Sequence, residues 1–311
     1  MNMHTGVPAV SVVMSVHNGG ADLHASIRSI LDQTGVDLEL IVVDDGSTDD
    51  TAALLDQLAA EDARLRKLHQ NNQGLTVALA RGCALARGRF IARQDCGDIS
   101  LPGRLRAELD AFEHAPDAAL VSCATRFVGP AGELLYEVSI DSATADASLL
   151  TLSPQDIRGP AHHGSTMFPR ALYEQVGGYR KEFYFAQDLD LWTRMIEHGR
   201  HRVIQETFYQ ASFALGSISS TYRAHQISIT HAILEGARLR RAGQDESPAL
   251  MQAALIRPNK RKSTPAERAA ALYFIGACLQ KRNDARAKDY FRRALRTYPL
   301  HLKSAYRFLL G

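Results

Sequence analysis

The sequence predicts an α/β fold, a mainly parallel sheet flanked by helices, followed by a helical C-terminal extension. Three observations predict it. Short apolar runs rich in Val and Ile alternate with helix-like segments between residues 8 and 124. Acidic residues directly follow two of these runs. From His231 onward the pattern is helical, without a β-rich run. Repeated strand–helix units form parallel sheets with helices on both faces.

Each predicted strand is a short apolar run, and each predicted helix has apolar residues at helical spacing. The predicted strands are Val10–Val16, Leu38–Val43, Leu65–Leu68, Phe90–Gln94 and Ala119–Ala124. The predicted helices are Ala21–Leu31, Asp49–Ala60, Leu75–Ala86 and a helix opened by Leu101-Pro102. Small and polar residues from Gly129 to Pro160 predict a hairpin and loop, and residues 162–191 are expected to be mixed and loop-rich.

The composition is that of an ordinary globular protein. The chain has 311 residues, 45% of them hydrophobic and 23% charged, enough for one large α/β domain with an appendage or for two modest domains. The longest apolar stretches are strand-sized, so no membrane span is expected. Met1 to Pro8 lacks the pattern of a secretory signal. The four cysteines show no CxxC pair, so reduced thiols in a cytoplasmic protein are expected.

Charge is distributed unevenly along the chain. Residues 236–311 contain seventeen Lys/Arg and five Asp/Glu, a net charge of +12, which leaves −10 for residues 1–235 because the whole chain carries +2. A basic tail favours an anionic partner, and a membrane surface is one candidate, which would make the protein peripheral on the inner face of the membrane. Nucleic acid is not expected, because no stacking aromatics punctuate the basic residues. A solvated helical face is the alternative.

Residues 271–299 have the apolar pattern of one degenerate tetratricopeptide-type helix pair. A single repeat cannot bury its own apolar face, and stable arrays need about three repeats. The alternative is a helical hairpin packed on the α/β body.

Carboxylates at the ends of two predicted strands indicate the chemistry of the chain. Asp44-Asp45 follows the strand at residues 38–43, and Asp95-Cys-Gly-Asp98 follows the strand at residues 90–94. In open α/β sheets ligands bind at this carboxyl edge. Asp95 and Asp98 are hard oxygen ligands suited to Mg²⁺ or Mn²⁺ on a diphosphate. The pattern therefore predicts a nucleotide and a divalent cation.

Several side chains are candidates for binding the nucleotide or moving a proton. The strand at residues 10–16 ends in Val16, His17 and Asn18, which leave room for a base. Asp45 is placed to accept from a base N–H or a ribose hydroxyl, and Asp188, in a segment expected to fold over the site, to take a proton from an attacking hydroxyl.

Each candidate has a structural alternative. Asp44 and Asp45 could cap the following helix, and Asp98 could begin one. Arg93 could reach a phosphate or pair with a carboxylate. His162 and His163 are expected to line the acceptor or lie on the surface, since adjacent histidines rarely chelate one ion together. Asp190 and Trp192 are expected to be structural.

Eight short motifs, in order, resemble the family 2 glycosyltransferases of GT-A fold. They cover residues 8–230, about three quarters of the chain. They are Val12-to-Asn18, Val42-Val-Asp-Asp-Gly-Ser-Thr-Asp49, Asn72-Gln-Gly74-Leu75, Ala92-Arg93-Gln94-Asp95, Leu101-Pro102-x-Arg104-Leu105, Gly177-Gly178-Tyr179, Asp188-Leu-Asp190-Leu-Trp192 and Tyr222-Arg223-x-His225-x-x-Ser228.

The resemblance implies an inverting enzyme that uses a nucleotide-diphospho-sugar, a UDP- or GDP-sugar, and a saccharide or lipid-linked acceptor in surface polysaccharide or glycolipid assembly. It implies a catalytic domain at 1–230, with a nucleotide-binding half at 1–100 and an acceptor half at 101–230, before a basic helical extension at 231–311. Asp188 would be the catalytic base. The implied nucleotide-binding residues are Val16, His17, Asn18, Asp45, Gly74, Arg93 and Asp95, and the implied ligands of Mn²⁺ or Mg²⁺ are Asp95, Asp98 and His225.

Two positions depart from the family pattern. Gly97 stands where the second acid of the DxD element is expected, with Asp98 one place later, and Gln187 replaces the acid that usually precedes the catalytic Asp188. A non-catalytic sugar-nucleotide-binding or scaffold protein therefore stays open, as does a nucleotidyltransferase, although the turn after the first strand has no basic residue. A dinucleotide oxidoreductase is not expected, because that turn lacks GxGxxG.

Overall fold

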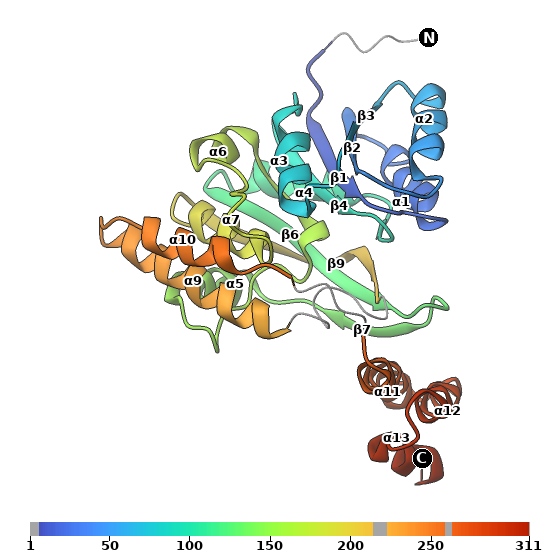
Figure 1. Cartoon of the computed structure of the whole chain (residues 1–311). Helices are drawn as coiled ribbons and strands as arrows, with labels where there is room; N and C mark the ends of the chain where they lie inside the picture. Colours follow the sequence, from blue (N-terminus) through green and yellow to red (C-terminus); the bar gives the residue numbers. More distant parts are fainter. Residues whose placement is uncertain (1–5, 214–222, 259–262, 311) are drawn as a thin grey trace. The chain divides into compact units, whose positions relative to one another are not determined.

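A computed structural model describes residues 6–213, 223–258 and 263–310 of the chain. It confirms the predicted α/β class. In the described residues, nine strands form one sheet in the order β3-β2-β1-β4-β8-β6-β9-β5, with β7 paired to β6 (Figure 1). Strands β3, β2, β1 and β4 are parallel to one another, whereas β8 pairs antiparallel with both β4 and β6.

The elements follow the predicted alternation in the first part of the chain. The strands are β1 Val10–Val16, β2 Leu38–Asp45, β3 Leu65–Gln70, β4 Phe90–Asp95, β5 Ile99–Ser100, β6 Ala118–Val128, β7 Leu134–Val138, β8 Thr166–Pro169 and β9 Arg200–Ser212. The first helices are α1 Asp22–Leu31, α2 Thr51–Glu61, α3 Leu75–Ala84, α4 Arg104–His114, α5 Ser142–Thr151, α6 Arg170–Gln175 and α7 Gln187–Met195. The later helices are α9 Arg223–Arg241, α10 Ser247–Leu255, α11 Pro265–Lys281, α12 Ala287–Thr297 and α13 Leu302–Leu310.

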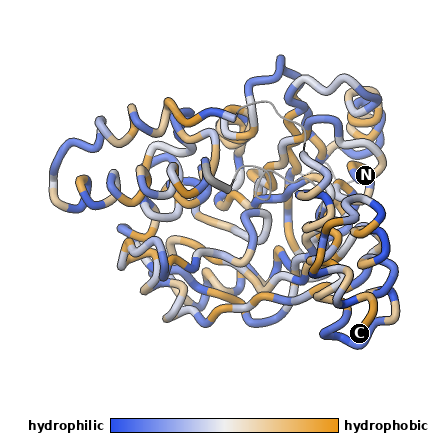
Figure 2. Tube along the Cα trace, turned by 60° about the horizontal axis from the view of Figure 1, so that its bottom comes forward, coloured by the Kyte–Doolittle hydropathy of each residue, from blue (hydrophilic) through white to orange (hydrophobic). Residues whose placement is uncertain are grey.

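Helices cover both faces of the parallel strands, as successive side chains on a strand point to opposite faces. Helices α1, α2 and α4 pack on the face that carries Val12, Met14 and Leu40. Helix α3 covers the opposite face, where Gly82 lies against Val13 and Val43. Figure 2 shows hydrophobic and hydrophilic stretches alternating along the chain trace.

The register of the parallel strands brings their carboxyl ends together. Ser15 of β1 pairs with Asp95 of β4, and Val16 pairs with Asp44 of β2. The acidic turns that follow β2 and β4 therefore leave the sheet at the same edge, on either side of the end of β1.

Two segments differ from the expectation drawn from the sequence. Residues 129–160 were expected to form a hairpin and loop, but they also contain helix α5. Its many small residues hid the helical pattern, although Asp141 caps the helix by accepting from the Thr144 N–H. The region expected to be loop-rich likewise includes the start of α7.

The chain divides into two compact units. The first contains residues 1–125, 138–211 and 228–256, and the second contains residues 126–137, 212–227 and 257–311. Helix α10 therefore belongs to the same compact unit as most of the sheet. That the catalytic domain ends at residue 230 stays a prediction. No helix in the described ranges is long and apolar enough to cross a bilayer.

The second unit has its own apolar core. Helices α11 and α12 form the helix pair at residues 271–299, and they pack against Leu135 of the β6–β7 hairpin. Tyr290 of α12 donates a hydrogen bond to the buried Glu133 in that hairpin. The helix pair therefore buries its face against the hairpin instead of against further repeats.

The close approach of α3 to the sheet depends on Gly82. A Cβ at this position would lie 2.6 Å from Val13 Cγ1 and 3.2 Å from Val43 Cγ2. We expect Gly82→Val to lower the free energy of unfolding by about 1–3 kcal/mol through overpacking. Urea unfolding checks this against Gly6→Val, which adds a side chain in open space. Equal stability of the two variants would contradict the packing described here.

Candidate active site

Asp45 holds the loop between β3 and α3. Its buried carboxylate accepts hydrogen bonds from the Gln73 and Gly74 backbone N–H groups, both at 2.8 Å, and from Gln70 Nε2 at 2.7 Å. A carboxylate offers about four acceptor positions, so these three bonds leave room for one more donor. Asp45 thus fixes the predicted nucleotide-binding loop around Gly74 and keeps capacity for a base N–H.

The neighbouring Asp44 serves the turn that follows β2. Its carboxylate accepts from the Ser47 N–H at 3.0 Å and lies 3.0 Å from His69 Nδ1. Burial opposes ionisation, but the Ser47 and His69 hydrogen bonds lower the pKa of Asp44. Of the two roles weighed for Asp44, these contacts favour the structural one.

The end of β1 forms the floor of a pocket. Asn18 adopts a left-handed backbone conformation with φ of 56° and accepts from the Thr48 N–H at 2.8 Å. His17 Nδ1 lies 3.0 Å from the Asp45 carbonyl oxygen. The pocket has a volume of about 320 Å³. Its lining residues are Ser15, Val16, His17, Asn18, Gly19, Asp22, Asp95, Cys96 and Gly97.

A tight turn after β4 explains how the sequence departs from DxD and still brings two carboxylates together. The Asp98 N–H donates to the Asp95 carbonyl at 3.3 Å, which closes a four-residue turn. Gly97 sits at the third position of this turn with φ of +94°, a conformation that favours glycine. Gln94 Nε2 also donates to the Asp98 carbonyl at 2.9 Å.

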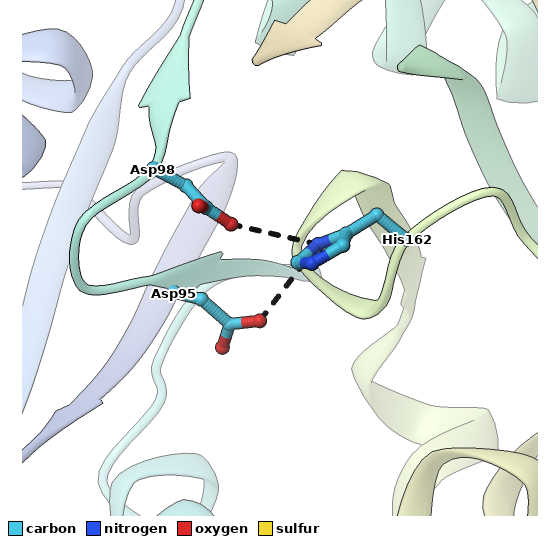
Figure 3. Close-up of side chains that lie close together, drawn as sticks. All are labelled: Asp95, Asp98 and His162. Atoms are coloured by element: carbon cyan, nitrogen blue, oxygen red, sulfur yellow. Dashed lines mark ion pairs between the residues drawn. The ribbon is translucent and has the colours of Figure 1, made fainter. Parts of the chain in front are cut away.

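His162 completes a three-residue cluster with these two carboxylates (Figure 3). Its Nδ1 lies 3.8 Å from Asp95 Oδ2 and 3.5 Å from Asp98 Oδ2. One ligand atom from each residue lies within 4.8 Å of the others, which suits a single cation. Nδ1 also accepts from the Gly164 N–H at 3.1 Å, and a cation on Nδ1 would take over the lone pair that this hydrogen bond uses.

Tyr209 of β9 contacts each of the three residues in the cluster. Its hydroxyl donates to Asp98 Oδ2 at 2.9 Å and accepts from the Asp95 N–H at 3.2 Å. Its ring stacks on the His162 ring with centroids 5.4 Å apart. Gly164 makes room for this hydroxyl, because a Cβ there would lie 1.9 Å from it. One buried phenol thus touches all three candidate ligands.

Arg93 and His163 form a buried layer beneath Asp95. Arg93 donates to Asp95 Oδ1 at 2.7 Å and to the Val13 carbonyl. Burial opposes the charged form of Asp95, but the Arg93 guanidinium holds the pKa of that carboxyl below its ordinary value. Burial lowers the pKa of His163 to about 3, so its neutral ring accepts from Arg93 and from the Tyr179 hydroxyl.

These contacts bear on the roles that the sequence left open for Arg93, His163 and His162. Arg93 is fully buried and pairs with a carboxylate, which was one of its two expected roles; a phosphate contact stays a prediction. The expectation that His163 lies on the surface is wrong, since its ring is buried beneath Asp95, whereas its place in an acceptor lining stays a prediction. His162 was set aside as a ligand from the sequence, and the structure places it against both carboxylates.

Asp188 lies in the first turn of α7, near the cluster. Burial raises the pKa of the Asp188 carboxyl, and the negative charge of Asp95 raises it further, while the Leu189 N–H opposes the shift. Asp188 and Asp95 are therefore close enough for their charges to interact. The segment before α7 also contacts the start of α3, next to the loop around Gly74, because the Phe183 carbonyl accepts from Thr76 Oγ1 at 2.7 Å.

Three further residues were singled out from the sequence. His225 is half-buried in the first turn of α9 and belongs to the second unit, so its role as a metal ligand stays a prediction. Tyr222 of the same motif lies outside the described residues. Asp190 accepts from Arg180 and Arg194, and Trp192 is buried, as expected of structural residues.

The donor set fits a hard divalent cation. The two carboxylates are hard oxygen ligands of the kind that Mn²⁺ and Mg²⁺ sites use, and the imidazole adds a nitrogen ligand that transition-metal ions accept more readily than Mg²⁺ does. Among the residues that line the pocket beside the cluster there is no Lys or Arg, whereas Asp22 and Asp95 are present. A diphosphate in this pocket would therefore need a cation to offset its charge.

Sequence comparison places the chain in a family. The profile of Glycosyl transferase family 2 matches residues 11–177. EpsE of Bacillus subtilis (strain 168), named as a glycosyltransferase, is 34% identical over 75% of this chain and 82% of that protein. The chondroitin synthase of Escherichia coli is 29% identical over 65% of this chain, which spans 29% of that longer protein. The chain belongs to glycosyltransferase family 2 and is a glycosyltransferase.

Solved structures share the fold at low sequence identity. The structure of S. aureus TarS 1-349 in complex with UDP-GlcNAc aligns with a TM-score of 0.55 and 14% identity, covering 96% of this chain and 89% of that one. The mannosyltransferase PcManGT from Pyrobaculum calidifontis, in complex with GDP-Man and Mn²⁺, aligns with a TM-score of 0.54 and 18% identity, covering 98% and 88%. The predicted family, fold and enzyme class are thereby confirmed.

Replacing histidines tests which one belongs to the cation site. We expect His162→Ala to raise the Kd for Mn²⁺ at least tenfold, because its Nδ1 faces both carboxylates. Isothermal titration calorimetry compares it with His225→Ala and with the control His114→Ala, on the exposed end of α4. A larger loss for His225→Ala than for His162→Ala would favour the ligand set drawn from the sequence.

The Tyr209 hydroxyl can be removed without removing its ring. We expect Tyr209→Phe to raise the Kd for Mn²⁺ about tenfold, the lower end of what outer-shell partners of metal ligands contribute. The variant keeps the stacking on His162 and loses both hydrogen bonds. Calorimetric titration beside Tyr298→Phe, a control in the second unit, measures the effect. An unchanged Kd would show that the ligands are held by other contacts.

Proposed function

We propose that the enzyme transfers a sugar from a nucleotide-diphospho-sugar to an acceptor hydroxyl with inversion at the anomeric carbon. One observation carries this proposal: Asp95 belongs both to the Asp95–Asp98–His162 cluster and to the lining of the β1 pocket, and its charge acts on Asp188. The pocket would take the nucleoside diphosphate, and Asp188 would face the acceptor.

The donor is proposed as a UDP- or GDP-sugar. Two structural relatives form complexes with UDP-GlcNAc and with GDP-Man, which supports this class of donor. The acceptor is proposed as a saccharide or lipid-linked hydroxyl in polysaccharide assembly, because the matched relatives include a chondroitin synthase. The reaction would take place in the cytoplasm, and the four free thiols agree with a reducing compartment.

The chain's own residues divide the work of transfer. Asp45 would accept from the nucleobase while it holds the Gly74 loop, and His17 and Asn18 would line the nucleotide. Asp188, as a carboxylate, would take the proton of the attacking hydroxyl, help that is typically worth about 10²–10⁴ in rate. Its raised pKa makes it a stronger base than an ordinary Asp.

Asp95, Asp98 and His162 would hold Mn²⁺ or Mg²⁺. A cation bound there supplies positive charge to the departing nucleoside diphosphate. Arg93 would keep Asp95 ionised and oriented toward that position, because its guanidinium is buried and bonded to Asp95 Oδ1.

Nucleoside diphosphate release in the presence of an acceptor separates this proposal from the non-catalytic alternative. Thermal shifts with UDP, GDP and their sugars, with and without Mn²⁺, first identify the donor. Mixtures of that donor with candidate acceptors are then assayed for free nucleoside diphosphate. Binding without turnover would favour the scaffold reading, and pyrophosphate release from a nucleoside triphosphate would favour a nucleotidyltransferase.

The pH dependence of transfer reports on Asp188. Since the base acts when ionised, kcat/KM should fall as the pH drops through the pKa of Asp188, which lies above the ordinary 3.8. We expect Asp188→Asn to lower kcat by about 10²–10⁴ and to leave the Kd of the donor nearly unchanged. Asp156→Asn, exposed and outside the cluster, is the matched control. A wild-type rate for Asp188→Asn would exclude its role as base.

A further inference from the structure

Helix α13 of the second unit presents an apolar face to solvent. Leu302, Tyr306 and Leu309 are 78%, 64% and 76% exposed. Their spacing of four and three residues places them on one side of the helix. The opposite side faces the core of the unit, where Ser304 is fully buried and Phe308 packs against the α11–α12 cluster. The helix is therefore held by one face and leaves an apolar face outward.

Positive charge lies beside this face. Residues 287–310 contain six Lys/Arg, all exposed, and one acidic residue, Asp289. Asp289 already pairs with Arg292 at 2.7 Å. Lys303 and Arg307 are four residues apart and form a row along the helix beside Leu302 and Tyr306. The surface thus combines apolar side chains with a bordering row of cations.

The charges and the apolar side chains together indicate what binds this face of α13. A second copy of this chain would bring an equally basic helix against it, so like charges would oppose a two-fold contact. A purely solvated face would explain the charges but not the three exposed apolar side chains. Anionic lipid meets both features, because headgroup phosphates attract Lys and Arg while Leu and Tyr enter the boundary with the acyl chains.

We propose that α13 docks the chain on an anionic lipid surface through Leu302, Tyr306 and Leu309, with Lys303 and Arg307 contacting lipid phosphates. The docking is a property of the second unit and does not depend on the transferase reaction. The basic tail indicated an anionic partner, and this proposal assigns the contact with that partner to one face of α13.

Vesicle co-sedimentation of the full chain tests this docking. We expect binding to vesicles with 30% phosphatidylglycerol in phosphatidylcholine, little binding to phosphatidylcholine alone, and loss of binding in 0.5 M salt. Lys303→Gln/Arg307→Gln should lower the binding constant about 10- to 25-fold, since each basic residue near such a surface contributes roughly fivefold. Leu302→Ser/Tyr306→Ser/Leu309→Ser should lower it at least tenfold.

Matched controls change the same chemistry on the first unit. Arg28→Gln/Lys67→Gln removes two exposed positive charges, and Met251→Ser/Leu255→Ser removes two exposed apolar side chains. These four residues belong to the first unit, so both control variants should bind as the wild type does. All variants alter exposed side chains, and circular dichroism verifies that they fold.

Four results would overturn the proposal. Equal binding of wild type and the α13 variants would place the lipid contact elsewhere, and equal binding to neutral and anionic vesicles would exclude the charge argument. Dimerisation in light scattering that the triple Ser variant abolishes, without vesicle binding, would make the face a self-association surface. Capture by an RNA oligonucleotide in place of vesicles would assign the charges to nucleic acid.

Discussion

Electrostatic balance among converging carboxylates is the constraint on which the site depends. Asp95 and Asp98 lie in one cluster, and the charge of Asp95 acts on Asp188; like charges so arranged raise the free energy unless positive charge offsets them. The chain supplies part of this offset through the buried Arg93, which pairs with Asp95. Burial is the largest cause of the raised pKa of Asp188, and the negative charge of Asp95 raises it further. A divalent cation between Asp95, Asp98 and His162 would complete the balance.

The sequence could predict the edge of the sheet but not every side chain that meets there. Asp45 and Asp95 were predictable because parallel strands in register end at the same edge, and both follow apolar runs. His162 was not, because its loop reaches Asp95 only through the antiparallel pairing of β8 with β4, which no local pattern encodes. Tyr209 likewise enters from β9, far along the chain.

The neighbouring histidines show how adjacent residues take different roles. His162 faces the carboxylates and keeps an exposed edge, while His163 is buried and neutral beneath Asp95. The objection that adjacent histidines rarely chelate one ion together was sound, since only His162 joins the cluster. The family profile ends at residue 177, yet Tyr209, which contacts both Asp95 and Asp98, lies beyond it.

Anomalous diffraction at the manganese edge, from crystals grown with Mn²⁺ and a nucleoside diphosphate, tests the central claim most directly. The account predicts one peak within bonding distance of Asp95, Asp98 and His162, with the diphosphate in the β1 pocket. A peak held by other residues, or a nucleotide bound away from this edge, would contradict it.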